Sequence, residues 1–280
     1  MDALNLWNGK LYLADMWEVV PQLPDESIDL IISDGPYGIT EHEWDRVSSI
    51  QEYNLELIKL FSQKLKPGGA LYLFGKPDCI DFIDYRPYLT LQAKIVWYQP
   101  SRLGQGRKTY TNNYDLIVYF IRGPQSRVFN LDHIRVPQLV ELTHRLRCER
   151  VPSVRNGKYS RTKYNEKGKN PGDVWGDIKQ LTYKSKELLS SKLHTIQKPE
   201  LLMRRLIAAS SNPGDVVLDP FAGTGTVPAV CMKMNRYFIA IEKDPQIYDL
   251  AVQRLQRVED SMKEDLFNFQ YDHKGSSTDF

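Results

Sequence analysis

The feature that most constrains the fold lies late in the chain, where a short apolar run meets a glycine-rich turn. Val216-Val217-Leu218-Asp219 has the composition of a buried strand, and residues 220–226 read Pro-Phe-Ala-Gly-Thr-Gly-Thr before an apolar helical stretch. A second apolar run, residues 237–241, ends in the acid Glu242. This succession is typical of a nucleoside-binding crevice in an open α/β sheet, because glycines let the backbone approach the ligand closely. The glycine spacing matches neither the Gly-x-Gly-x-x-Gly fingerprint nor a P-loop, which favours a ligand smaller than a dinucleotide.

The rest of the chain alternates in the same way between apolar strand-like runs and helical stripes, which predicts an α/β sheet. Expected strands cover residues 11–15, 28–33, 70–74, 95–98, 116–120, 216–219 and 237–242. Expected helices cover residues 16–23, 50–65, 78–90, 198–211, 226–234 and 244–259, with a polar, frayed tail from residue 260. Because no crossover helix precedes it, the strand at 116–120 is expected to form an antiparallel edge.

Asp34-Gly35-Pro36-Tyr37 follows the apolar run at residues 28–33. Open α/β sheets bind ligands outside the carboxyl ends of their strands, so this loop is placed to contact one. Pro36 stiffens the loop, Asp34 adds a charged acceptor, and Tyr37 adds a flat face on which a base can stack. Acceptors beside an aromatic face suit an exocyclic amino group on a planar ring. Taken alone, the tetrapeptide fits an ordinary turn equally well.

Composition excludes several classes of protein. The 280 residues contain no apolar run near the ~20 residues of a membrane span, and the amino terminus lacks the features of a signal peptide. The three cysteines, Cys79, Cys148 and Cys231, are scattered, which predicts reduced thiols in a cytoplasmic protein and no zinc site.

The formal net charge of +2 conceals an uneven distribution. Residues 102–192 hold 19 Lys and Arg against 8 Asp and Glu, whereas the remainder holds 18 against 27. Residues 122–192 also break the α/β alternation and mix basic residues with aromatics such as Trp175 and Tyr183, without clear helices or strands at 156–172. A basic, aromatic block favours nucleic acid as partner, with a solvated loop region as the alternative. We therefore expect one sheet domain, residues 1–121 and 193–280, interrupted by a target-binding region, residues 122–192.

Five motifs together resemble the amino-methylating DNA methyltransferases. Asp219-Pro-Phe221-Ala-Gly223-Thr-Gly225-Thr is similar to their S-adenosyl-L-methionine (AdoMet) motif, and Asp34-Gly35-Pro36-Tyr37 resembles their catalytic Asp-Pro-Pro-Tyr. The other three motifs are His194-Thr195-Ile196-Gln197-Lys198-Pro199, Asn112-Asn113-Tyr114-Asp115 and Asp173-Val174-Trp175. The order, with the catalytic loop first and the AdoMet loop last, resembles the β group, a circularly permuted chain on a Rossmann-like, mostly parallel sheet. The likeness spans about residues 10–258.

The resemblance implies a role for each matching residue. Asp34, Gly35, Pro36 and Tyr37 would act on the target base, with Asp34 also near the cofactor. The residues that would bind AdoMet are Asp15, Thr195, Gln197, Lys198, Asp219, Phe221, Ala222, Gly223, Thr224, Gly225, Thr226, Glu242 and Lys243. Glu242 would bind the ribose hydroxyls, Asp15 the adenine amino group of AdoMet, and Lys198 would lie near its methionine end. No metal is expected.

The implied activity is methyl transfer to the N6 amino group of an adenine flipped out of double-stranded DNA. Cytosine N4 is the alternative target, since Asp34 favours adenine without deciding it. A methyltransferase of RNA or protein is a further alternative. An inactive AdoMet- or DNA-binding homologue is another, and its support is Gly35, which stands where the family usually has proline. The resemblance leaves a restriction endonuclease partner and a homodimer open.

Overall fold

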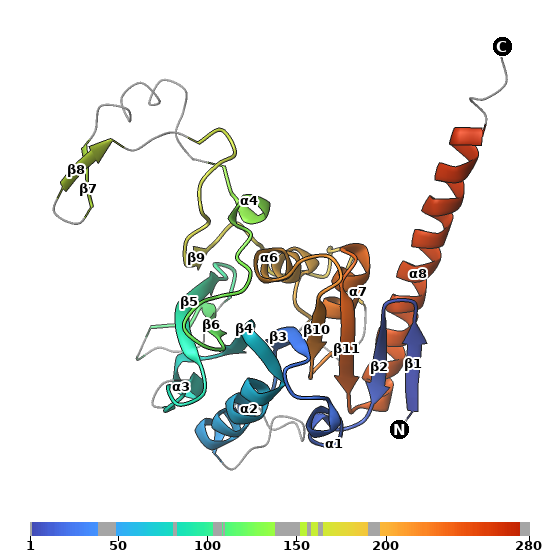
Figure 1. Cartoon of the computed structure of the whole chain (residues 1–280), viewed down its shortest axis with the longest axis horizontal. Coiled ribbons are helices and arrows are strands. Elements are labelled where there is room, and N and C mark those ends of the chain that lie inside the picture. Colours follow the sequence, from blue (N-terminus) through green and yellow to red (C-terminus); the bar gives the residue numbers. More distant parts are fainter. Residues whose placement is uncertain are drawn as a thin grey trace.

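A nine-stranded mixed sheet forms the centre of the protein in the computed structural model (Figure 1). The structure describes residues 2–38, 49–80, 83–102, 108, 110–137, 152–155, 158–161, 165–189 and 197–274. Within these residues the strand order is β1-β2-β11-β10-β3-β4-β6-β5-β9. The strands are β1 (Asp2–Leu6), β2 (Gly9–Leu13), β3 (Ile28–Ser33), β4 (Leu65–Gly75), β5 (Thr90–Tyr98), β6 (Tyr114–Ile121), β9 (Val174–Trp175), β10 (Val216–Asp219) and β11 (Tyr237–Glu242).

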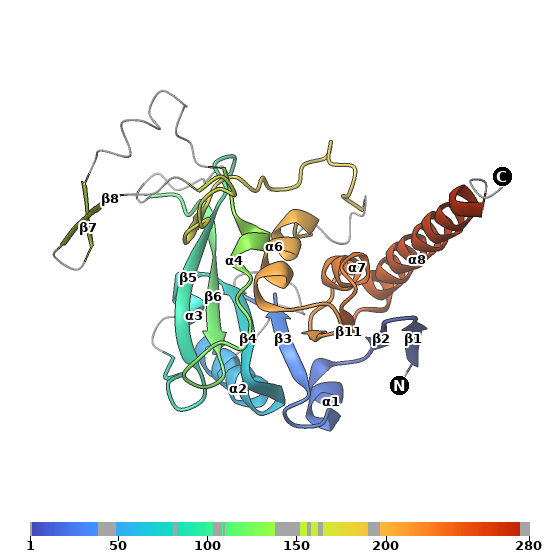
Figure 2. The same cartoon turned by 45° about the horizontal axis from the view of Figure 1, so that its top comes forward.

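Helices cover both faces of this sheet. They are α1 (Met16–Val19) with the 3₁₀ turn η1 (Val20–Gln22), α2 (Ile50–Lys64), α3 (Pro77–Ile80), α4 (Leu131–Ile134), α6 (Glu200–Ser210), α7 (Thr226–Lys233) and α8 (Pro245–Lys274). A separate hairpin pairs β7 (Pro152–Arg155) with β8 (Lys158–Arg161). Figure 2 shows α8 running past α7 and out beyond the sheet. In the part of the chain that the structure describes, no helix is both long and apolar enough to cross a membrane.

The two faces of the sheet bury alternate residues of each strand, as the pleat requires. On β3, Leu30 and Ile32 pack into the cluster that contains α6, α7 and α8, whereas Ile31 packs into the cluster that contains α1 and α2. The strands β3 and β6 are apolar almost throughout, because helices cover the sheet on both sides.

The strand order sets the position of the loops that carry the motifs. Strand β10 lies parallel to β3 on one side and to β11 on the other, and β11 lies parallel to β2. The loops after β2, β3, β10 and β11 therefore leave the same edge of the sheet, at the carboxyl ends of the strands. These are the loops that begin near Asp15, Asp34, Asp219 and Glu242.

Several elements differ from the sequence prediction. The strand β6 is antiparallel to β4 as expected, but it lies inside the sheet between β4 and β5 rather than at an edge, because β5 folds back beside it and β9 extends the sheet further. The antiparallel edge strand is β1. The helix expected at residues 78–90 ends at Ile80, and Tyr85, ahead of Pro87, packs its ring 5.0 Å from that of Phe120. Helix α8 continues to Lys274, past the expected frayed end, and β8 lies where no strand was expected.

The described ends of residues 122–192 pack against the sheet domain. Trp175 and Ile178 are buried in the core, and the indole nitrogen of Trp97 donates a hydrogen bond of 2.8 Å to the Ile178 carbonyl. The Arg205 guanidinium of α6 lies 4.8 Å from the centre of the Trp175 ring. The segment around β9 is therefore part of the sheet domain's packing.

Candidate active site

Among the described residues, two side chains donate hydrogen bonds to the carboxylate of Asp34, in the loop after β3. The hydroxyl of Tyr37 donates to its Oδ1 at 2.8 Å. The ammonium of Lys198, directly before α6, donates to Oδ1 at 2.9 Å and to Oδ2 at 2.7 Å. Asp34 follows β3, a central strand, so this carboxylate lies at the edge of the sheet where the loops converge.

Aromatic rings surround the ammonium of Lys198. Its Nζ lies 5.6 Å from the centre of the Tyr37 ring and 5.4 Å from that of Phe74 at the end of β4. The Lys198 side chain is only 5% exposed, against 23% for Asp34. A cation so buried requires a compensating charge, which Asp34 supplies.

Gly35 joins the catalytic loop to the glycine-rich loop. A methyl group placed on Gly35 would lie 2.8 Å from Cε2 of the Phe221 ring. Real Cβ atoms do not approach a carbon that closely, so the ring packs directly on the glycine backbone. This contact gives a physical reason for glycine at the position where the family usually has proline.

The glycine-rich loop is held by the acid of the next strand. Glu242 accepts hydrogen bonds from the amides of Gly223 and Asp244, both at 2.8 Å. Gly225 caps α7 with a φ of 76°, and its α-carbon faces Ala251 of α8 so closely that a Cβ would lie 3.2 Å from the Ala251 side chain. Only glycine suits this combination of left-handed backbone and close helix packing. Burial raises the pKa of Glu242.

Asp219 ends β10 beneath this loop and is almost fully buried. Its Oδ1 accepts a hydrogen bond of 3.2 Å from the amide of Phe221. Burial raises the pKa of this carboxyl well above its ordinary value, and the nearby acids Asp34 and Glu242 raise it further. Asp34, Asp219 and Glu242 therefore bring three carboxyl groups, which can accept hydrogen bonds from a polar ligand, to one edge of the sheet.

The residues present fit a polar nucleoside cofactor. Besides the three acids, the hydroxyls of Thr224 and Ser33 are buried at this edge, and no hydrogen-bond partner for either lies in the described part of the chain. Unpaired buried hydroxyls are costly and mark places where a ligand can supply the missing bond. Among the residues that the structure describes, no group of three or more His, Cys, Asp or Glu could hold a metal ion.

Comparison with known proteins agrees with this geometry. A family model described as DNA methylase, covering the N6 and N4 enzymes, matches residues 28–253. The chain belongs to this family of DNA methylases. The family transfers methyl groups from AdoMet, so the protein is an AdoMet-dependent methyltransferase.

Two curated relatives show how far the likeness extends. The chain is 34% identical over 257 residues to the Type II methyltransferase M.HpaI of Haemophilus parainfluenzae, covering 88% of this chain and 74% of the relative. It is 34% identical over 241 residues to the DNA adenine methyltransferase YhdJ of Escherichia coli (strain K12), covering 84% and 78%. Among solved structures, the M1.HpyAVI–SAM complex shares the fold with a TM-score of 0.59 at 23% identity, over 88% of this chain and 98% of that one.

Several residues assigned to the cofactor by resemblance have other contacts in this methyltransferase. The carboxylate of Asp15 accepts a hydrogen bond of 2.9 Å from the Trp17 amide and so caps α1. It remains at the shared edge, because the Ala14 amide donates to the Glu242 carbonyl. Lys243 is exposed, and Thr195 lies outside the described residues.

Gln197 and Thr226 are also engaged with the protein. The Gln197 amide group accepts from the Leu189 amide at 3.1 Å and donates to the Glu187 carbonyl at 2.8 Å. The Thr226 hydroxyl accepts a hydrogen bond of 3.0 Å from Arg254 of α8. Gln197 therefore holds the segment at residues 187–189, and Thr226 holds the start of α7 against α8.

Arg254 was not predicted from the sequence. Its guanidinium is buried and joins the cofactor loop to Glu200, at the start of α6, with an N–O distance of 2.9 Å. The sequence pattern that could have predicted it is a basic residue on the same side of the helix as Ala251 and Leu255, which both face the core. A charge placed on the apolar side of a helix indicates a buried partner.

Among the cysteines, the structure describes the side chain of Cys231. It lies buried in α7, and burial raises the pKa of its thiol, which makes it an inert packing residue. The Cys79 side chain and Cys148 lie outside what the structure describes.

Proposed function

We propose that the protein is a site-specific DNA methyltransferase that modifies the N6 amino group of adenine in a flipped-out base. The observation that carries this proposal is the Asp34 carboxylate, fixed by Tyr37 and Lys198 and joined to the glycine-rich loop through the Gly35–Phe221 contact. An oriented acceptor directly beside a nucleoside-binding loop is what methylation of an amino group requires.

Each residue of the loop has a part in the reaction. The ring of Tyr37 would stack on the base that has left the duplex. Asp34 and a carbonyl of Gly35 or Pro36 would accept hydrogen bonds from the amino hydrogens. These bonds draw the nitrogen lone pair out of conjugation with the ring and stabilise the positive charge that develops on nitrogen. Asp219, Glu242 and the 221–226 loop would hold AdoMet, which would supply an electrophilic methyl group. As the N–C bond forms, the S–CH3 bond would break, S-adenosylhomocysteine would leave, and the amino nitrogen would lose one proton.

Adenine is favoured over cytosine for two reasons. Asp34 stands at the first position of the catalytic motif, where the resemblance favours adenine enzymes over the serine of many cytosine enzymes. The relative YhdJ, 34% identical over most of both chains, is named a DNA adenine methyltransferase.

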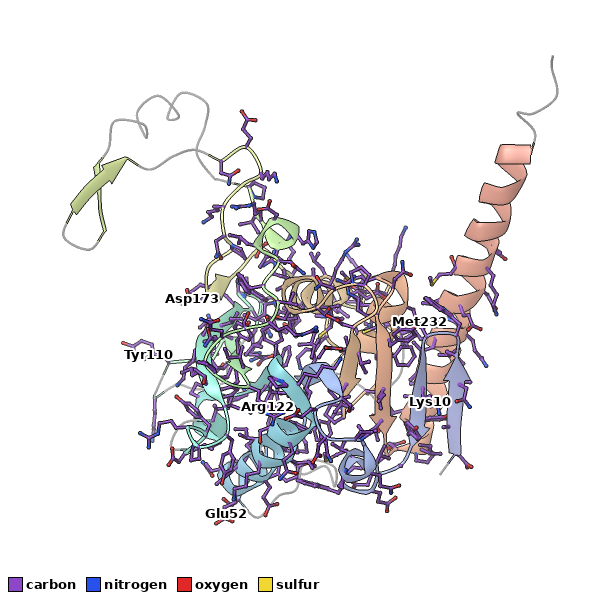
Figure 3. The ribbon with its side chains drawn as sticks, in the orientation of Figure 1. Lys10, Glu52, Tyr110, Arg122, Asp173 and Met232 are labelled. Atoms are coloured by element: carbon purple, nitrogen blue, oxygen red, sulfur yellow. The ribbon has the colours of Figure 1, made fainter. Side chains whose placement is uncertain are left out.

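We assign DNA contact to residues 122–192 and the neighbouring loop that carries Tyr110. Figure 3 shows Tyr110 pointing away from the body, and its side chain is 99% exposed. Tyr183 is 86% exposed, with the Lys184 ammonium 5.5 Å from its ring centre. Exposed aromatics beside cations suit phosphate and base contacts.

A restriction endonuclease partner is part of the proposal, because relatives such as M.HpaI are named Type II methyltransferases. We also propose that the enzyme acts in the cytoplasm, where its DNA substrate would lie. A homodimer remains a proposal by analogy with the β group, and sedimentation of the purified protein would test it.

The test is nucleoside analysis of treated DNA. Purified protein is incubated with unmethylated genomic DNA and AdoMet, and the DNA is digested to nucleosides for mass spectrometry. N6-methyl-2′-deoxyadenosine is the expected product, and heat-inactivated enzyme is the control. N4-methylcytosine would contradict the assignment of the base, and methylation of tRNA or protein instead of DNA would contradict the substrate.

A further inference from the structure

The ion pair between Lys198 and Asp34 limits the hydrogen-bond acceptor sites that the carboxylate can offer to a target amino group. A carboxylate offers about four lone-pair sites for hydrogen bonds. Tyr37 occupies one on Oδ1, and Lys198 occupies one on each oxygen. The described residues therefore leave a single acceptor site, on Oδ2.

We propose that Lys198 is the positioning residue of the catalytic carboxylate, which it holds so that one acceptor site on Asp34 Oδ2 faces the target amino group. The inference rests on the proposed function. With donors on both oxygens, rotation of the carboxylate breaks at least one charged hydrogen bond, so the remaining site keeps one direction. A preoriented acceptor avoids reorganisation during methyl transfer.

The chain around Lys198 is anchored on both sides. Before it, the Gln197 side chain is tied to the backbone of residues 187 and 189. After it, the amide of Glu200 donates to the Glu187 carboxylate at 2.9 Å, where α6 begins. Helix α6 then packs Leu202 and Leu206 into the core. Lys198 therefore extends from a rigid base toward Asp34.

The same anchors connect Lys198 to the end of residues 122–192. Glu187, which contacts both Gln197 and the start of α6, lies only four positions from the exposed Tyr183. A segment assigned to DNA contact and the residue that holds the catalytic carboxylate thus share one hydrogen-bonded support.

A competing role for Lys198 is direct contact with the methionine end of AdoMet. The geometry disfavours it, since two of the three ammonium hydrogens are donated to Asp34 and the Tyr37 and Phe74 rings lie beside Nζ. The two roles differ in what they control. Positioning of Asp34 affects the rate of transfer with AdoMet bound, whereas a cofactor contact affects the binding of AdoMet.

The experiment compares Lys198→Met with Lys64→Met. Lys64 is a matched control, because its side chain is 7% exposed and pairs with Asp25 at 2.7 Å, while its other donors bond to the Pro21 and Leu23 carbonyls near η1. Single-turnover rates are measured at saturating AdoMet and duplex DNA, and the AdoMet Kd is measured by calorimetry.

Loss of the charged hydrogen bonds in Lys198→Met is expected to slow transfer about 10- to 100-fold and change the AdoMet Kd less than about threefold. Lys64→Met is expected to lower the melting temperature while leaving the rate and Kd within about twofold of wild type. Lys198→Arg keeps the positive charge and can still donate two hydrogen bonds to the Asp34 carboxylate, so it is expected to recover part of the rate.

Three results would overturn the inference. One is a wild-type rate in Lys198→Met, and another is a raised AdoMet Kd with a normal rate at saturation. The third is equal slowing in Lys64→Met. If Lys198→Met does not fold, Lys198→Gln is measured by the same criteria. Failure of the proposed function is a separate outcome, in which the wild-type enzyme itself makes no N6-methyl-2′-deoxyadenosine in DNA.

Discussion

The contact between Gly35 and Phe221 predicts that the catalytic loop and the cofactor loop cannot be changed independently. The Gly35→Ala variant would place Cβ 2.8 Å from Cε2 and 3.1 Å from Cδ2 and Cζ of the Phe221 ring. Favourable carbon–carbon contacts lie at about 3.5–4.0 Å, so the ring must move by roughly 0.5–1 Å. Gly35 is not among the glycines with positive φ, which means the effect arises from space and not from backbone strain.

Overpacking of this kind costs about 1–3 kcal/mol. In the AdoMet-free protein the Phe221 ring can relieve the clash by swinging away. If Phe221 lines the AdoMet site as proposed, binding of AdoMet requires the ring to return, and the cost is expected as lost affinity. A cost of about 1–3 kcal/mol corresponds to a rise of about 5- to 150-fold in the AdoMet Kd.

Isothermal titration calorimetry with AdoMet measures this effect. Gly176→Ala is the matched control, because its Cβ would lie 3.5 Å from Tyr98, which is ordinary contact. In the double variant Gly35→Ala with Phe221→Leu, the added methyl is expected to cost less than it does in the wild-type background. A wild-type AdoMet Kd in Gly35→Ala would refute the reasoning.

Three further predictions concern the electrostatics of the protein. Burial raises the pKa of Glu242 above its ordinary 4.5. Between pH 4.5 and the raised pKa, the folded protein therefore binds more protons than the unfolded chain. The free energy of unfolding falls as pH rises through that window. Glu242→Gln should flatten this part of the curve in urea titrations at several pH values, and an unchanged curve would contradict the assignment. Arg254→Met should lower the unfolding free energy by about 2–4 kcal/mol, because it leaves Glu200 without one of its two ion-pair partners and Thr226 without a donor. A loss below about 0.5 kcal/mol in the same titrations would contradict this role of Arg254. Lys184→Ala should weaken DNA binding about equally for all sequences and reduce the slope of log K against log salt by about 1, whereas an unchanged slope would remove Lys184 from the interface.

Local pattern predicted much of the fold. The apolar run at residues 28–33 predicts a buried strand, and in β3 Leu30, Ile31 and Ile32 alternate between two buried faces. The turn at residues 220–226 and the acid at Glu242 also lie where the sequence placed them, since short-range chemistry determines both. The order of the strands was not predicted, because the resemblance gave only the order of the motifs along the chain and a mostly parallel sheet.

Contacts between residues far apart in the chain could not be predicted from the sequence. Lys198 and Asp34 are 164 positions apart, and their pairing depends on how α6 packs against the sheet. The resemblance placed Lys198 near the cofactor, without its ion pair. The interior position of β6 was missed for a similar reason, because pairing with β5 and β9 is a property of the whole sheet. Arg254 is a third case, since its partners lie on other elements.

The most direct test of the account is the single-turnover rate of Asp34→Asn at saturating AdoMet and DNA. Asparagine keeps the shape of the side chain but removes its charge and replaces one acceptor oxygen with a donor. The account predicts that methyl transfer to adenine falls by at least about 100-fold, while AdoMet still binds and the exposed-site control Asp84→Asn is unaffected. A rate within about threefold of wild type would contradict the role of Asp34 as the acceptor that activates the amino group.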